Sequence, residues 1–136
     1  MKGIAMRLRK LITITAIITT ICSGFKIQAD PLTEQNAILA IIGEAADQQY
    51  RGMLAVACAL RNRGTLVGVV GLHAKHVQLE PPWVWEMARK AWIESATNDI
   101  TGGATFWENI DRFGKPEWAK KMHPTVRIKD HQFYRP

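Results

Sequence analysis

Two neighbouring apolar segments, residues 34–46 and 50–63, constrain the fold more than any other feature of the sequence. Thr33 is a good N-cap for the first segment, and Gly64 is a good terminator for the second. Apolar residues recur with helical spacing in both segments, so we predict a helix over each range. A helix that is apolar on most sides packs in the interior. The sequence therefore predicts a core built on these two helices.

The rest of the chain predicts one more helix and a small sheet. Helical spacing returns over 83–97, after an irregular stretch over 65–79 that we expect to be a long loop. Residues 101–107 and 125–129 have the composition of short strands. A chain of 136 residues has room for one compact domain. The expected fold class is α+β, a single small domain that is mainly helical with a short antiparallel sheet in the C-terminal third.

Residues 1–29 differ in composition from the rest. They begin with basic residues, continue with an apolar run over 11–22 and end with Ala29. This order is that of a secretory signal peptide that is cleaved after Ala29. The run is shorter than the roughly 18 residues of a spanning helix, so the alternative is an uncleaved, weak signal anchor. We expect an exported domain of residues 30–136, which meets a membrane only through 1–29 if that segment is retained.

The charge distribution argues against a nucleic-acid partner. The net charge is +6, but residues 1–29 hold five basic side chains and no acid. The remaining residues carry 13 basic and 12 acidic side chains, a net charge of +1. A domain that binds nucleic acid or an anionic membrane surface usually has a marked basic excess. Residues 30–136 also have one cysteine, Cys58, which lies in an apolar helix and is expected to be a buried structural thiol.

Glu44 is the most informative single residue, because it stands within the otherwise uncharged stretch 36–46. Desolvation and the nearby helix C-terminus both favour the protonated form of its carboxyl. Such an acid can protonate a leaving oxygen, which is the general-acid step of glycoside cleavage. The alternative is a structural ion pair with Arg61 or Arg63. Gly43 removes side-chain bulk beside the carboxyl and would let a substrate approach closely.

Several separated motifs resemble the catalytic domain of SleB-type cell wall hydrolases in order and spacing. They are Ile42-Gly-Glu-Ala45, Gly52-Met-Leu-Ala-Val-Ala57, Arg61-Asn-Arg63, Thr101-Gly-Gly-Ala-Thr-Phe106 and Ile128-Lys-Asp-His-Gln-Phe-Tyr134. The resemblance implies a lysozyme-like fold and cleavage of bacterial peptidoglycan glycan strands, in many members as lytic transglycosylases. It also implies that Glu44 is the catalytic acid. The stretch 107–118 is more similar to a phage-associated branch, so a spore-specific role is not expected.

A second carboxylate would be needed for ordinary hydrolysis, which uses a pair of acids that flank the bond. The candidates are Glu108, Asp99, Asp111 and Asp130, but none has neighbours as apolar as those of Glu44. Each is better interpreted as a cap or a solvated charge. The absence of an obvious pair favours a lytic transglycosylase, in which the sugar's own 6-hydroxyl attacks and one glutamate acts as acid and then as base.

Candidate substrate contacts lie late in the chain. If the resemblance holds, the segment of Gly102, Gly103 and Thr105 makes a tight turn and lines the glycan cleft with backbone donors. A phosphate-binding loop is not expected there, because the required spacing is missing. Of the aromatic side chains, Trp107 and Tyr134 are the expected sugar contacts. Ordinary core packing is the alternative for these two and for Phe106, Trp118 and Phe133.

The histidines do not predict a metal centre. His73 and His76 have a spacing of interest, but no third ligand is evident, and we expect no metal and no cofactor. His131 lies in a family-like motif and would orient its neighbours by hydrogen bonding or be purely structural.

The leading functional hypothesis is an exported, endolysin-like cell wall hydrolase of the periplasm, cell wall or extracellular space. It would cleave the β-1,4 bond between N-acetylmuramic acid and N-acetylglucosamine in peptidoglycan glycan strands. The alternative is a non-catalytic peptidoglycan-binding or assembly protein on the same fold.

Overall fold

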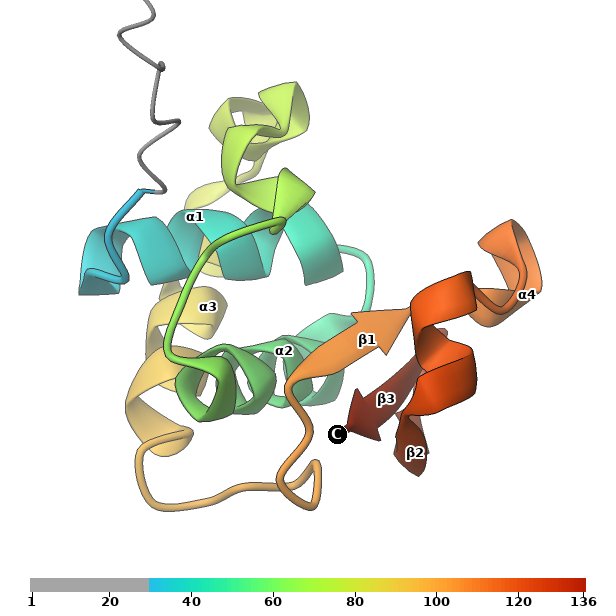
Figure 1. Ribbon diagram of the computed structural model, residues 1–136. Helices are drawn as coiled ribbons and strands as arrows, with labels where there is room; N and C mark the ends of the chain where they lie inside the picture. The colour runs from blue at the N-terminus through green and yellow to red at the C-terminus, as the bar shows by residue number, and fades with distance from the viewer. Residues whose placement is uncertain (1–29) are drawn as a thin grey trace, which may run out of the picture.

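The computed structural model describes residues 30–136 (Figure 1). The signal peptide predicted over 1–29 lies outside the described residues and stays a prediction. In chain order the elements are α1 (Glu34–Ala45), α2 (Gln49–Arg63), the 3₁₀ helices η1 (Val70–His73) and η2 (Lys75–Leu79), α3 (Pro82–Glu94), β1 (Phe106–Glu108), α4 (Ile110–Phe113), the 3₁₀ helix η3 (Glu117–Lys121), β2 (His123–Ile128) and β3 (His131–Arg135).

The two predicted core helices are confirmed. The hydroxyl of Thr33 caps α1 by accepting a hydrogen bond from the N–H of Asn36 at 3.2 Å. Gly64 ends α2 in the left-handed conformation, with φ of 70°, which costs a glycine little. Every residue from Gly52 to Leu60 is buried, so α2 is central. Within the described range, no helix is both long and apolar enough to cross a bilayer.

Helix α3 completes the helical part and packs against both α1 and α2. It starts at Pro82, where a proline fits because the first N–H groups of a helix have no intrahelical partner. Its inward face carries Val84, Ala88, Ala91 and Trp92. Cys58 is buried as predicted, and burial raises the pKa of its thiol to about 11.

The stretch 65–79 differs from the predicted long loop. It contains η1 and η2, and η1 packs closely on α1. Leu66, Val69 and Val77 in this stretch are buried in the core, which explains why the chain is wound tightly rather than extended over the surface. Short 3₁₀ turns leave little periodicity in a sequence, so the pattern alone did not reveal them.

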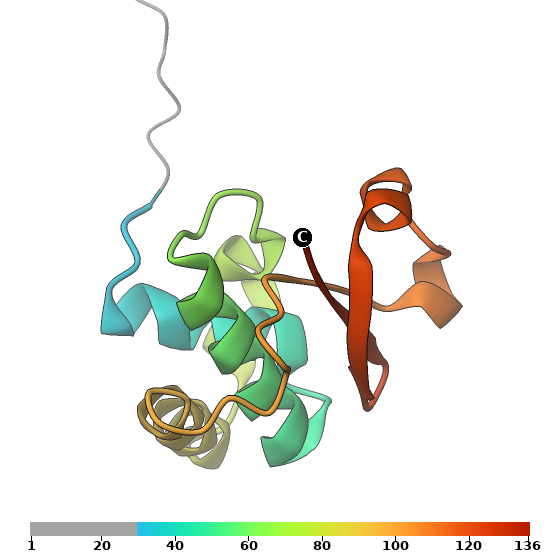
Figure 2. The same ribbon diagram turned by 60° about the horizontal axis from the view of Figure 1, so that its bottom comes forward.

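A three-stranded antiparallel sheet lies on the other side of the molecule from α3, together with α4 and η3 (Figures 1 and 2). The strand order is β1-β3-β2, with Phe106 opposite Tyr134. The fold class is therefore confirmed, but the predicted strand over 101–107 is too long, because only its last residues belong to β1. Strand β3 and the short helix α4 were not predicted as elements.

Candidate active site

A cleft of about 850 Å³ lies between the helices and the sheet. One wall comes from the end of α1, from η1 and from η2, and the other comes from β1, α4 and η3. The cleft contains four carboxylates, two arginines and two histidines, alongside four aromatic side chains of the sheet wall, Phe106, Trp107, Phe113 and Trp118. This mixture of charged and aromatic groups suits a polar ligand with flat apolar faces, such as a sugar chain.

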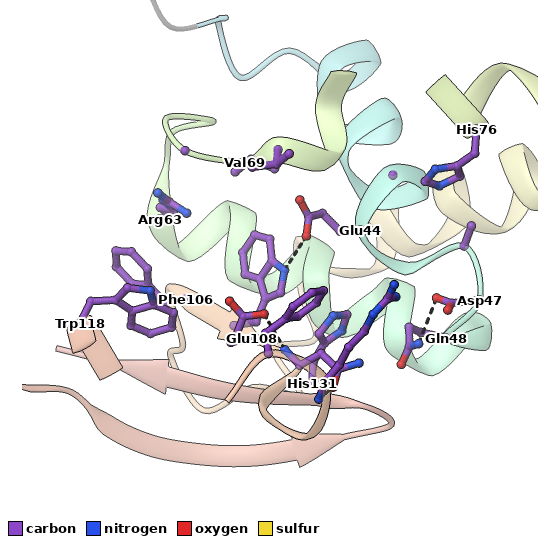
Figure 3. A pocket seen from close by; sticks show the side chains of 18 of the residues that line it. Glu44, Asp47, Gln48, Arg63, Val69, His76, Phe106, Glu108, Trp118 and His131 are labelled. Atoms are coloured by element: carbon purple, nitrogen blue, oxygen red, sulfur yellow. Dashed lines mark hydrogen bonds between the residues drawn. The ribbon is translucent and has the colours of Figure 1, made fainter. Parts of the chain in front are cut away.

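Glu44, the predicted general acid, lines this cleft from the last turn of α1 and is half-buried (Figure 3). Its Oε1 accepts a hydrogen bond from the backbone N–H of Gly71 at 2.6 Å. Its Oε2 accepts one from the indole N–H of Trp107 at 3.1 Å. One donor belongs to η1 and the other to β1, so both walls of the cleft hold the carboxyl in place.

A close backbone approach explains why Gly43 precedes Glu44. A Cβ atom at Gly43 would lie 1.8 Å from the carbonyl oxygen of Gly71, and one at Gly71 would lie 2.7 Å from the backbone nitrogen of Glu44. The two glycines therefore let η1 reach the carboxyl. The backbone of η1 fills the space that a side chain at Gly43 would occupy, while Gly43 itself lines the cleft. Close approach of substrate at Gly43 stays a prediction.

The alternative role for Glu44, an ion pair with Arg61 or Arg63, is not seen. Arg61 donates to the Ser95 hydroxyl at 2.8 Å, and its guanidinium lies 3.7 Å from the centre of the Trp92 ring. Arg63 lines the cleft but stacks over Phe106 and donates to a loop carbonyl. Between residues 30 and 136, none of the ion pairs includes Glu44.

The donors from Gly71 and Trp107 hold the two carboxyl oxygens of Glu44 in the cleft, through contacts that are remote in sequence. A carboxyl that is fixed in place and lines a cleft has the geometry that general acid or base catalysis requires.

The aromatic residues divide between the cleft and the core. Phe106, Trp107 and Trp118 line the cleft, whereas Phe133 and Tyr134 are 0% and 2% exposed. The predicted substrate contact of Tyr134 is wrong for this structure, because its side chain is enclosed beneath the Trp118 ring at a centroid distance of 5.4 Å. Trp107 remains a candidate contact, and Phe106 and Trp118 join it.

The segment of Gly102, Gly103 and Thr105 does not line the cleft. The two glycines form the expected tight turn, with φ of 65° and 80°, but the N–H of Gly103 donates to Asp99 at 2.8 Å. The N–H of Thr105 donates to the carbonyl of Tyr134 at 2.9 Å. The prediction that these residues present backbone donors to a glycan is therefore wrong for Gly103 and Thr105, whose N–H groups are paired within the domain, and Gly102 does not line the cleft.

Of the four candidates for a second carboxylate, only Glu108 lines the cleft, where its Oε1 accepts a hydrogen bond from the N–H of Asn109 at 2.9 Å. Asp47 and Glu80 also line it, and the sequence reasoning missed both. Asp47 comes just after the end of α1 and is close to Glu44 in the sequence. This closeness is the signal that could have identified it as a cleft residue.

The other three candidates are engaged outside the cleft. Asp99 caps the glycine turn and accepts from Asn62 at 3.1 Å. Asp111 pairs with Arg127. Asp130 exchanges hydrogen bonds with Gln48, as Gln48 Nε2 donates to Asp130 Oδ2 and the N–H of Asp130 donates to Gln48 Oε1, both at 3.0 Å. Structural roles as caps or paired charges account for all three.

Comparison with known proteins adds independent evidence on the fold. No family model and no curated protein sequence matches the chain. Among solved structures, the catalytic domain of the germination-specific lytic transglycosylase SleB from Bacillus anthracis matches with a TM-score of 0.60 and 26% sequence identity, covering 75% of this chain and 93% of that one. The chain has a SleB-type domain. The catalytic domain of the Bacillus cereus SleB protein matches similarly, with a TM-score of 0.58, 26% identity and coverage of 75% and 88%.

The histidines of this SleB-type domain lie in different places. His73 Nε2 lies 3.0 Å from a carboxylate oxygen of Asp30, whereas His76 and His131 line the cleft. Within residues 30–136, no three His, Cys, Asp or Glu side chains are grouped as metal ligands. Sequence spacing suggested a relation between His73 and His76, but these residues belong to successive 3₁₀ helices and have different surroundings.

Proposed function

We propose that this SleB-type domain cleaves peptidoglycan glycan strands as a lytic transglycosylase, at the β-1,4 bond between N-acetylmuramic acid and N-acetylglucosamine. The observation that carries the proposal is the carboxyl of Glu44, half-buried in a cleft and held by two donors from opposite walls. The likeness to a domain described as a lytic transglycosylase supports the reaction class.

Glu44 acts first as the general acid. Its carboxyl proton passes to the glycosidic oxygen as the bond from that oxygen to the anomeric carbon of N-acetylmuramic acid breaks. The carboxylate that remains is stabilised by the N–H groups of Gly71 and Trp107. These donors are already in place before the proton leaves, so little reorganisation is needed.

Glu44 then acts as the general base. It takes the proton of the 6-hydroxyl of the same muramic acid while that oxygen attacks the anomeric carbon. The products are a 1,6-anhydro sugar and a free 4-hydroxyl on the leaving strand, and Glu44 is again protonated. No water is consumed, so a second carboxylate to activate water is not required.

The sheet wall would hold the sugar rings. Phe106, Trp107 and Trp118 line it, and the rings of Phe106 and Trp118 pack against each other at a tilt of 39° and a centroid distance of 5.3 Å. Aromatic faces pack well against the apolar faces of pyranose rings. We propose that the substrate reaches the domain outside the cytoplasm, with residues 1–29 as the export signal.

Mass spectrometry of the soluble products from purified peptidoglycan tests the proposal. Muropeptides that end in an anhydro sugar are expected. Fragments one water heavier would instead indicate a hydrolase and make Glu108 or Asp47 the second carboxylate. Protein that pellets with the wall but releases no fragments would overturn the proposal and favour a non-catalytic binding protein.

A further inference from the structure

His131 is the most enclosed titratable side chain that lines the cleft. It begins β3 opposite Ile128 and is only 8% exposed. Its ring meets that of Phe133 edge to face, at a centroid distance of 6.3 Å. In Figure 3 the ring rises from the floor of the cleft, below Glu44 in that view. Packing therefore fixes the ring beside the carboxyl that we propose as the catalytic acid.

The inner nitrogen of this ring has no protein partner. Nδ1 of His131 is closed off from solvent and makes no hydrogen bond to any described residue. An enclosed polar nitrogen without a partner costs about 1–3 kcal/mol, whether it is an N–H donor or a bare acceptor. A neutral imidazole carries its one N–H on either nitrogen. Nδ1 is the nitrogen that is closed off, so we place the N–H on Nε2, where a ligand in the cleft can pair it.

The surroundings also favour the neutral ring. Burial lowers the pKa of His131 below its ordinary value. The negative charges of Glu44 on α1, Asp47 after α1, Asp130 before β3 and Glu108 on β1 oppose this effect without overcoming it. At neutral pH the cleft floor therefore presents an uncharged N–H donor among carboxylates.

We propose that Nε2 of His131 donates a hydrogen bond to the acetamido carbonyl oxygen of a sugar bound in the cleft, and so selects N-acetylated strands. This inference rests on the proposed function, which makes an N-acetylated glycan the substrate. An acetamido carbonyl is a neutral acceptor that projects from the sugar ring, and it suits a neutral donor at the cleft floor. Ionised carboxylates in the cleft accept hydrogen bonds and cannot donate to it, and the proton of Glu44 goes to the glycosidic oxygen in the proposed function.

Oligosaccharide binding to the full chain tests this inference without relying on turnover. Binding is followed by the fluorescence of the cleft tryptophans, with N-acetylated and de-N-acetylated glycan oligosaccharides as probes. His131→Phe keeps a ring but has no donor, whereas His131→Asn keeps an N–H. His123→Phe is the matched control, because His123 is exposed on the same sheet and does not line the cleft.

The Kd for the N-acetylated probe is expected to rise about five- to tenfold in His131→Phe, as for the loss of one hydrogen bond. His131→Asn should recover part of this loss, and the de-N-acetylated probe should show no such rise. An unchanged Kd, or an equal rise for both probes, would overturn the inference.

Two further results keep the test decisive. If His131→Phe does not fold, ¹⁵N NMR of the wild-type imidazole decides: Nε2 must carry the proton, and its resonance must move when the N-acetylated probe binds. A proton on Nδ1, or an Nε2 resonance that does not move, would contradict the inference. Failure of the proposed function is separate, since it would appear as a wild-type protein that releases no muropeptides.

Discussion

The two glycine pairs of the domain have different surroundings. Gly43 and Gly71 face each other, and a Cβ atom at either would collide with backbone atoms. Gly102 and Gly103 lie in an open turn, where positive φ angles rather than a lack of space require glycine. The first pair brings a backbone N–H to Glu44, whereas the second pair is held by Asp99 away from the cleft. The missing side chain therefore serves the site in one region and the backbone conformation in the other.

Of the substitutions that test this comparison, Gly43→Ala should have the largest effect on stability and activity. The added methyl would meet the carbonyl of Gly71, which cannot rotate away as a side chain can. Helix α1 and η1 must then separate, and we expect a loss of stability of about 3 kcal/mol, at the upper end for overpacked interiors. Release of fragments from peptidoglycan should also be lost. Urea unfolding and a release assay measure both, and a stable, active variant would show that the contact is dispensable.

Trp107→Phe removes the indole N–H that donates to Glu44, the second of its two hydrogen bonds, while keeping an aromatic ring. A hydrogen bond to a charged group contributes about 1.5–3 kcal/mol, so we expect kcat to fall about tenfold or more. Trp85→Phe is the control, because its indole donates to the Glu80 carbonyl and does not line the cleft. Equal activity of the two variants would mean that the indole bond does not contribute.

Asp99→Asn tests the structural role of the second glycine pair. Burial alone raises the pKa of Asp99, but hydrogen bonds from Thr101, Asn62 and Gly103 outweigh it and hold the pKa below its usual value. A lowered pKa means that the ionised form stabilises the fold, fully above the usual carboxyl pKa and less as pH falls through the folded value. The variant should therefore unfold at a lower temperature than wild type at pH 7.

The difference in unfolding temperature should narrow as the pH falls below about 4, because the carboxyl of Asp99 then takes up its proton in the unfolded chain before it does so in the folded one. Glu86→Gln on the exposed face of α3 controls for the change in net charge. Thermal unfolding as a function of pH measures the effect. A difference that stays constant down to acidic pH would contradict the assignment.

Gly103→Ala should have the smallest effect. Nothing lies within 4 Å of the added methyl, so the cost comes only from the φ of 80°. We expect a loss of about 1 kcal/mol in unfolding free energy and unchanged release of fragments. A marked fall in activity would mean that this turn serves the cleft after all.

The helical half of the domain could be predicted from the sequence because its signals are local. The cap at Thr33, the terminator at Gly64 and the apolar periodicity each act over a few residues. The prediction for Glu44 also starts from a local signal, a carboxyl in an uncharged stretch, and the motif resemblance then assigns it the catalytic role.

The sheet half and the surroundings of Glu44 depend on contacts between residues distant in sequence. Tyr134 is of a residue type that can stack on a sugar ring, but the pairing of β3 between β1 and β2 places its side chain in the core. Gly71 lies 27 positions from Glu44, and no local pattern shows that its N–H reaches the carboxyl. The glycines of the 101–105 stretch are typical of a ligand-binding turn, and no local pattern shows that Asp99 accepts hydrogen bonds from the N–H groups of Thr101 and Gly103.

The most direct test of the account is the release of soluble fragments from purified peptidoglycan by Glu44→Gln, measured beside its binding to the same material. The variant keeps the size of the side chain and removes the transferable proton. Release should fall at least about 100-fold, the lower bound for a proton-transfer residue. Pelleting with the wall should stay as in wild type, with Glu86→Gln as the control. The unfolding midpoint should fall, because the amide offers one acceptor to the two donors of Gly71 and Trp107. A folded Glu44→Gln variant that releases fragments at the wild-type rate would contradict the account.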